Sequence, residues 1–293
     1  MAGILAPPLV LMAKIDPRLR ASTIRLFAID VDGTLLDSSH QLRPAVRDSV
    51  CRLATSGIQV VLATARGPQA VSKIVQQFGF CPWLICFSGA WIGKLDPRSF
   101  KPSDVQFDRR MPPANARSVL EAALAHQVEP NVFTPEDWRV GAINEEILQE
   151  SKIVDLQPSI VTELLAEGEG VNKIMLVSSL DRAGQVLPRI AESIRSFCTA
   201  TFSKPNYLEV LPLGVNKATA LAMLSGSLNI ELEQVAAIGD GLNDVEMLSE
   251  VGLPIAMGNA AEDLKAKAVW VVGTNDDGGV AEAIERLLRE RGG

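Results

Sequence analysis

The chain has 293 residues, of which 47% are hydrophobic and 22% charged, and its formal net charge is −7. This composition supports a large buried core and excludes a wholly disordered chain, and the length is sufficient for two domains. No basic stripe interrupts the acidic balance, so nucleic acid is not expected as a partner. No apolar run reaches the ~20 residues of a membrane-spanning helix, so we expect no membrane partner either.

Residues 1–14 are apolar without a leading basic region, and Pro7–Pro8 interrupts them, which argues against a secretory signal. We expect residues 1–20 to form an N-terminal extension, with organellar targeting as the alternative to a cytoplasmic location. The four cysteines make no C-x-x-C pair and are typical of reduced thiols. His40 and His126 lie outside any motif, so histidine chemistry has little support. The sequence indicates no particular oligomeric state.

Short apolar runs alternate with helical patterns, which is typical of a parallel sheet covered by helices on both faces. Up to residue 87 the expected order is strand 24–30, helix 44–56, strand 58–64, helix 69–78 and strand 83–87. From residue 216 it is helix 216–228, strand 235–239, helix 242–249, strands 253–257 and 269–272, and helix 280–291. The pattern predicts an α/β fold with a doubly wound, Rossmann-like sheet.

The pattern changes near Gly93, where prolines become frequent, and the α/β rhythm resumes near Asn206. The intervening stretch has its own expected helices, 114–126 and 183–197, and a strand at 173–178. This is enough for an inserted α/β cap domain at 93–206. The catalytic core would then comprise residues 21–92 and 207–293.

Two aspartates, Asp30 and Asp32, follow the first expected strand in the segment D-V-D-G-T. Ligands of open α/β sheets gather at the carboxyl ends of the strands, and residues two apart on a strand project to the same side. Two neighbouring carboxylates repel each other and require a cation or a shared proton. Alone, the segment is equally explained as an ordinary turn.

Three further segments carry polar residues at strand ends or helix starts. Thr64 ends the second strand, Lys217 lies at the start of the helix 216–228, and Asp240, Asn243 and Asp244 belong to G-D-G-L-N-D. Carboxylates with waters and phosphate oxygens are typical ligands of magnesium, and a helix N-terminus binds phosphate. Taken singly, each segment is also explained as a helix cap or a solvated side chain.

In this order the four segments resemble the haloacid dehalogenase superfamily of phosphotransferases, most closely its Cof-type phosphatases with a C2-type cap. The stretches 251–260 and 274–281 resemble the same branch. Three residues depart from its usual pattern: Ala65 and Ala218 replace common glycines, and Ser88 stands where an Asn-Gly pair is common. These departures concern how the substrate fits beside Thr64 and Ser88.

The resemblance implies that Asp30 is the nucleophile and that Asp32 is the general acid and base. It implies a magnesium site made by Asp30, the backbone carbonyl of Asp32, and Asp240. It also implies that Thr64, Lys217 and Asn243 bind the phosphate. Asp244 would orient Lys217 or a metal-bound water. We expect further residues to contact the substrate and set specificity: Arg66, Ser88, Trp138, Arg139, Asn172 and Lys173.

The sequence therefore predicts a magnesium-dependent phosphatase that hydrolyses a small phosphorylated metabolite, such as a sugar phosphate or a phosphorylated cofactor, through an aspartyl-phosphate. One alternative is a phosphomutase or a sugar-phosphate-specific phosphatase of the same superfamily. An alternative of another class is a non-catalytic phosphate sensor, which the large insert and Asp32 argue against.

Overall fold

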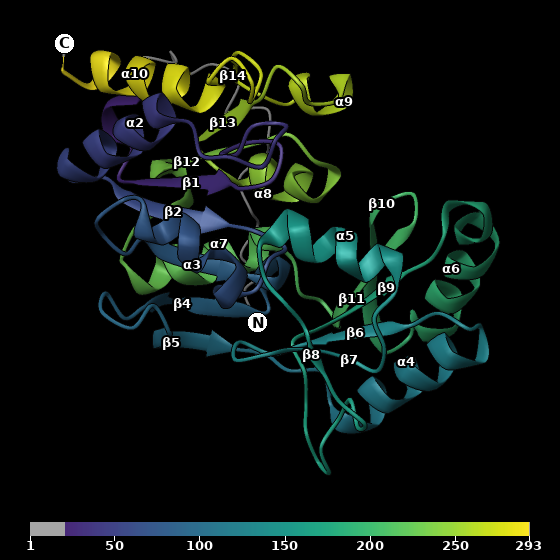
Figure 1. The fold of residues 1–293 in the computed structure, drawn as a ribbon. Helices are drawn as coiled ribbons and strands as arrows, with labels where there is room; N and C mark the ends of the chain where they lie inside the picture. The colour runs from purple at the N-terminus through teal and green to yellow at the C-terminus, as the bar shows by residue number, and fades with distance from the viewer. Residues whose placement is uncertain (1–20, 293) are drawn as a thin grey trace, which may run out of the picture.

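Two β-sheets organise the chain in the computed structural model, which describes residues 21–292 (Figure 1). The expected extension at 1–20 and its targeting alternative lie outside the described residues. Within 21–292, no helix combines the length and the apolar character needed to cross a bilayer.

The larger sheet has the strand order β14-β13-β12-β1-β2-β3-β4-β5. The strands from β14 to β3 are parallel, and β4 and β5 extend the sheet as antiparallel strands. Their bounds are β1 Leu26–Asp30, β2 Gln59–Ala63, β3 Trp83–Cys86, β4 Trp91–Leu95, β5 Pro102–Asp108, β12 Val235–Gly239, β13 Leu253–Ala256 and β14 Trp270–Val271. The central strand β1 is completely buried, as its unbroken apolar sequence predicts.

Helices cover both faces of this sheet, because alternate side chains of each strand point to opposite faces. Phe27 and Ile29 pack toward α2 (Pro44–Thr55), α3 (Pro68–Gln76) and α10 (Gly279–Gly292). On the other face, Leu26 and Ala28 pack toward α7 (Lys217–Ser227) and α8 (Val245–Glu250). The short helix α9 (Glu262–Lys265) lies next to β13. The predicted doubly wound core is confirmed.

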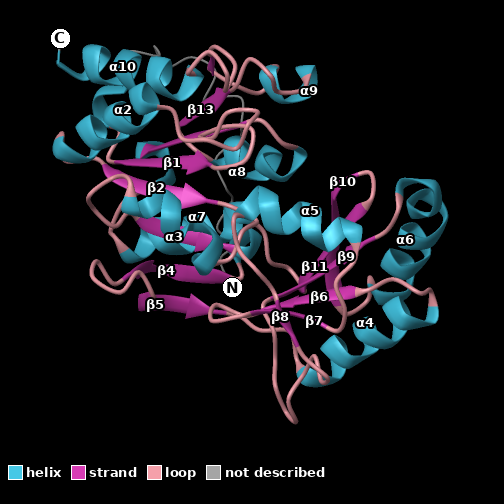
Figure 2. Ribbon diagram, in the orientation of Figure 1, coloured by secondary structure: helices cyan, strands magenta, loops and turns pink. Residues whose placement is uncertain are grey.

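The smaller sheet forms a cap over the carboxyl ends of the core strands, with the order β10-β11-β9-β6-β7-β8 (Figure 2). The strand bounds are β6 Pro130–Phe133, β7 Trp138–Val140, β8 Ser159–Ile160, β9 Lys173–Val177, β10 Cys198–Lys204 and β11 Tyr207–Pro212. Helices α4 (Pro113–Ala125) and α6 (Leu180–Ile194) pack on its outer face. Helix α5 (Glu145–Val154) lies on the side facing the core.

The junctions between core and cap differ from those expected. The hairpin of β4 and β5 pairs with β3, so the chain leaves the core sheet after Asp108 instead of at Gly93. Strand β11 pairs with β9 of the cap, so the chain returns after Pro212 instead of at Asn206. Two of the prolines that suggested a boundary, Pro97 and Pro102, lie within this hairpin, and Pro102 begins an edge strand that tolerates a missing N–H.

Candidate active site

The polar segments identified in the sequence meet at one edge of the core sheet. Asp30 ends β1, Thr64 follows β2, and Asp240 follows β12, and these three parallel strands are neighbours. Lys217 begins α7, and Asn243 lies in the 3₁₀ turn Leu242–Asp244 before α8. The carboxyl ends of adjacent parallel strands necessarily lie side by side, so the convergence follows from the fold.

Lys217 lies at the centre of this group and is almost completely buried. Its Nζ donates hydrogen bonds to Oδ1 of Asp30 at 2.5 Å and to Oδ1 of Asp244 at 2.8 Å. A capping box of Asn216 and Thr219 fixes the start of α7, and therefore the direction in which Lys217 enters the site.

The cluster holds more negative than positive charge. Burial, together with the neighbouring Asp244, raises the pKa of Asp30 well above its usual range, although Lys217 opposes the shift. Burial likewise raises the pKa of Asp240 to about 6, against the hydrogen bond from Thr34. Burial lowers the pKa of Lys217, but Asp244 and Asp30 outweigh it and raise the pKa above its usual value. The site therefore has the electrostatics of one that binds a cation.

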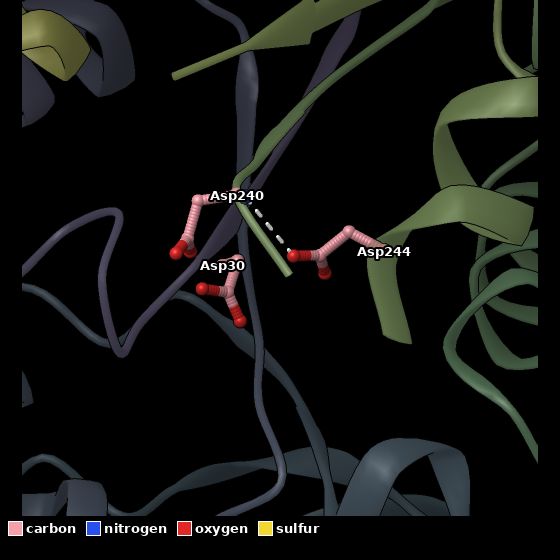
Figure 3. A group of neighbouring side chains, drawn as sticks. All are labelled: Asp30, Asp240 and Asp244. Carbon is pink, nitrogen blue, oxygen red and sulfur yellow. Dashed lines mark hydrogen bonds between the residues drawn. The ribbon is translucent and has the colours of Figure 1, made fainter. Parts of the chain in front are cut away.

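Asp30, Asp240 and Asp244 each offer an oxygen within 4.8 Å of the others (Figure 3). Asp244 is already committed to the protein, because its Oδ2 accepts the N–H groups of Asp240 and Gly241 while its Oδ1 accepts Lys217. In the described chain, the Asp30 carboxylate accepts one hydrogen bond and that of Asp240 two, against three for that of Asp244. Asp30 and Asp240 are therefore the carboxylates better placed to bind an ion, and their all-oxygen donor set fits magnesium.

Gly33 makes the close approach of the two loops possible. It has φ +83°, and a Cβ at this position would lie 2.4 Å from Oδ2 of Asp240. Asp240 is further held by Thr34 Oγ1 at 2.8 Å and Asn259 Nδ2 at 3.3 Å. Any other residue at position 33 would displace the Asp240 carboxylate.

Asp32 is held by a second group of residues. Arg66 donates two hydrogen bonds to its carboxylate, from Nε at 2.8 Å and from a terminal nitrogen at 2.5 Å. His40 Nδ1 lies 3.6 Å from Oδ1 of Asp32. Desolvation raises the pKa of Asp32, but the nearby His40 and the hydrogen bonds from Arg66 outweigh it and hold this pKa well below its usual range.

His40 was missed by sequence reasoning, which gave histidine chemistry little support. It lines the cavity described below, and a tight turn presents it there with φ +58°. In that turn the N–H of His40 donates to the carbonyl of Asp37, and the Asp37 carboxylate accepts two backbone N–H groups. The signal that could have found it is Asp37, which opens a turn four residues after Gly33.

Ser88 lies in a strained turn beside Thr64. Phe87 and Ser88 both have φ +51°, a conformation that glycine and asparagine adopt more easily. The turn is held because the N–H of Ser88 donates to the carbonyl of Thr64 and that of Phe87 to the carbonyl of Arg66. The Asn-Gly pair that is common at this position in the Cof-type branch adopts such a backbone more easily than Ser88 does.

A cavity of about 530 Å³ lies between the core edge and the cap. Core residues at its wall include Asp30, Asp32, Thr64, Lys217 and Asn243, and the cap adds residues from several strands and from α5. A small molecule with its phosphate at Asp30 would therefore be enclosed by both parts of the chain.

Four of the six expected specificity residues, Arg66, Ser88, Trp138 and Lys173, line this cavity. Trp138 is 1% exposed, stacks on Phe133 and donates to Oδ1 of Asn131, so it offers little surface to a ligand.

Arg139 and Asn172 do not line the cavity within the described residues, contrary to expectation. Arg139 forms ion pairs with Asp137 and Glu169. Asn172 donates to Oδ1 of Asp108 at the core–cap junction. Their side chains are engaged by neighbouring protein groups, which a sequence pattern does not reveal.

A model of the haloacid dehalogenase-like hydrolase family matches residues 27–284. The chain belongs to this family. It is 30% identical over 243 residues to the HMP-PP phosphatase of Klebsiella pneumoniae (strain 342), which covers 83% of this chain and 87% of that protein. It is 31% identical, with the same coverage, to the HMP-PP phosphatase of Citrobacter koseri.

Solved structures agree with this membership. A haloacid dehalogenase-like hydrolase from Bacteroides thetaiotaomicron has a TM-score of 0.81 and 25% identity, covering 90% of this chain and 99% of its own. One from B. subtilis has a TM-score of 0.80 and 27% identity, covering 90% and 100%. The predicted family, the α/β fold with a cap, and the enzyme class, a phosphatase of this family, are therefore confirmed. The phosphate-sensor alternative is set aside.

Proposed function

We propose that the chain is a magnesium-dependent phosphatase that releases phosphate from a small metabolite through an aspartyl-phosphate on Asp30. The observation that carries the proposal is the buried Lys217 between Asp30 and Asp244, at the end of a capped cavity. The two relatives that are 30% and 31% identical over 243 residues are phosphatases, which supports the same activity here.

The first chemical step is assigned to Asp30. One of its oxygens accepts a hydrogen bond from Lys217, and among the described residues no protein donor binds the other. In the proposed step an Asp30 oxygen bonds to phosphorus while the bond from phosphorus to the leaving oxygen breaks. The leaving oxygen takes the proton of Asp32. A covalent intermediate of this kind divides one difficult displacement into two easier ones.

In the second step water attacks the phosphorus, Asp32 accepts the proton of that water, and the bond from phosphorus to Asp30 breaks. Arg66 holds Asp32 in its ionised form, which is the form this step requires. The first step requires the protonated form. The negative charge of a bound phosphate raises the pKa of a neighbouring carboxyl group and so favours that form.

Asp30, Asp240 and the backbone carbonyl of Asp32 are the groups proposed to hold magnesium. The ion would offset negative charge on the transferring phosphoryl group. Lys217 adds a fixed positive charge from the protein. Thr64, at a strand end, and Asn243, before α8, are proposed to donate hydrogen bonds to phosphate oxygens.

The cavity volume of about 530 Å³ suits a small metabolite, because small-molecule sites typically measure ~300–1,000 Å³. The phosphomutase alternative shares the core chemistry and differs in the fate of the phosphoryl group. Incubation with a hexose phosphate followed by product analysis distinguishes the two: a mutase yields an isomeric phosphate, whereas a phosphatase yields the free sugar and phosphate.

The decisive experiment measures phosphate released from a panel of phosphorylated sugars and cofactors, with magnesium or with excess chelator. We expect magnesium-dependent release from at least one compound, and none from the Asp30→Asn variant. Release that persists in that variant would contradict the proposal.

A further inference from the structure

Lys173 is a buried cap residue whose hydrogen bond crosses to the core. It begins β9 and is 5% exposed, and its Nζ donates to the backbone carbonyl of Ala65 at 2.8 Å. Within the cap, its ammonium group lies 3.4 Å from Oε2 of Glu209 and 4.9 Å from the centre of the Phe133 ring. The ammonium is thus enclosed by protein groups, which argues against its expected role as a substrate contact.

Ala65 lies between two residues of the proposed chemistry. Thr64 is proposed to bind phosphate, and its Oγ1 accepts the backbone N–H of Arg66 at 3.1 Å. The Arg66 guanidinium holds Asp32 and also lies 3.4 Å from the carbonyl of Ile153 on α5. The cap therefore contacts the 64–66 segment at two points, one on the Ala65 backbone and one on the Arg66 side chain.

The pairing with Glu209 explains how a lysine can be buried here. A buried ammonium is costly unless a carboxylate and hydrogen-bond acceptors surround it. Glu209 supplies the charge, and Ala65 supplies an acceptor from the other part of the chain. The arrangement is complete only when cap and core are docked as they are here, because neither part alone provides both partners.

We propose that Lys173 is a positioning residue that couples the docked cap to catalysis: it fixes the 64–66 segment and, through Arg66, the orientation of Asp32. The proposal rests on the proposed function. Its consequence is that closing the cap does more than exclude water. It also completes the support of the general acid and base.

The test is a double variant, Lys173→Met with Glu209→Gln, which removes both buried charges together and leaves neither unpaired. The matched control is Arg139→Met with Glu169→Gln. This second cap ion pair has contacts of 2.7 and 3.0 Å, and all of its hydrogen bonds in the described chain go to cap residues. Thermal unfolding of both variants measures how much of any loss reflects stability alone.

We expect the Lys173 double variant to lower kcat about 10-fold for an alkyl phosphate, a fraction of the ~10²–10⁴-fold that general acid–base catalysis contributes. The loss should be smaller for p-nitrophenyl phosphate, whose leaving group needs little protonation. The control should show neither effect. Equal losses on both substrates, or kinetics that match the control, would overturn the proposal.

A second measurement places both double variants in an Asp32→Asn background. If Lys173 acts through Asp32, its double variant should slow that enzyme less than about twofold further, because the two effects share one pathway. Full additivity would overturn the coupling. A wild-type chain inactive on every phosphorylated compound would refute the proposed function. An active wild type with an unaffected Lys173 double variant would refute the coupling alone.

Discussion

The core and the cap use buried charge in opposite ways. At the core edge, in the part of the chain that the structure describes, the carboxylates of Asp30, Asp240 and Asp244 meet a single ammonium, that of Lys217. In the cap, Lys173 is paired with Glu209, and Arg139 with two carboxylates. An imbalance that folding alone would not favour indicates a site for a charged ligand. The Arg139 cluster, whose partners all lie in the cap, serves the architecture. The comparison predicts that substitutions in the core cluster lower activity and that substitution of Arg139 lowers stability, whereas Lys173, which bonds to the core, is expected to affect catalysis.

The largest effect is expected for Asp30→Asn. Phosphate release should fall by at least ~10⁴-fold, because an amide oxygen is a poor nucleophile. The thermal midpoint should stay the same or rise, since the raised pKa of Asp30 shows that the fold disfavours its charged form. Steady-state kinetics and thermal unfolding on one preparation check both parts. A lower midpoint would mean that Asp30 also stabilises the folded state.

The response to magnesium should also differ between core variants and cap variants. Excess chelator should abolish turnover, and added magnesium should restore it. Magnesium should raise the thermal midpoint of the wild-type chain, because an ion that binds only the folded state stabilises it. The rise should disappear in Asp240→Asn and persist in the cap variant Glu169→Gln. A metal-induced rise that Asp240→Asn retains would place the ion elsewhere.

The third prediction concerns Asp32→Asn, which keeps the backbone carbonyl but loses the acid and base. Turnover of alkyl phosphates should fall by ~10²–10⁴-fold, and less for an aryl phosphate. Because hydrolysis of the intermediate then lacks its base, an aryl phosphate should leave covalent phosphate on Asp30. Rapid quenching with peptide mass analysis would detect it. Phosphate on Asp240 or Asp244 instead would show that the nucleophile is misassigned.

The smallest kinetic effect is expected at Arg139 of the cap. Arg139→Met removes the hydrogen bonds to Glu169 and Asp137, and should lower the free energy of unfolding by about 1.5–3 kcal/mol. Its kcat/KM should stay within about twofold of wild type, because Arg139 lies outside the cavity wall. Denaturant unfolding and kinetics on the same samples test this. A large kinetic loss with unchanged stability would show that Arg139 acts in catalysis or substrate binding and not in stabilising the cap.

The sequence by itself determined the fold class and most of the core site. Unbroken apolar strands, helical periodicity and polar residues at strand ends are local patterns, and parallel strands bring such ends together without further information. These patterns are therefore sufficient to place Asp30, Thr64 and Asp240 at one edge of the sheet. Strand Val235–Gly239 was predicted with its observed bounds.

Only the tertiary structure decided the partners across the cavity. The clamp of Arg66 on Asp32 joins residues 34 apart, and the bond from Lys173 to Ala65 joins residues 108 apart. The edge hairpin of β4 and β5 likewise belongs to the core because β4 pairs with β3, which its proline-rich sequence did not indicate. Such contacts depend on how elements distant in the sequence pack against one another, and periodicity along the chain carries no information about distances between separate elements.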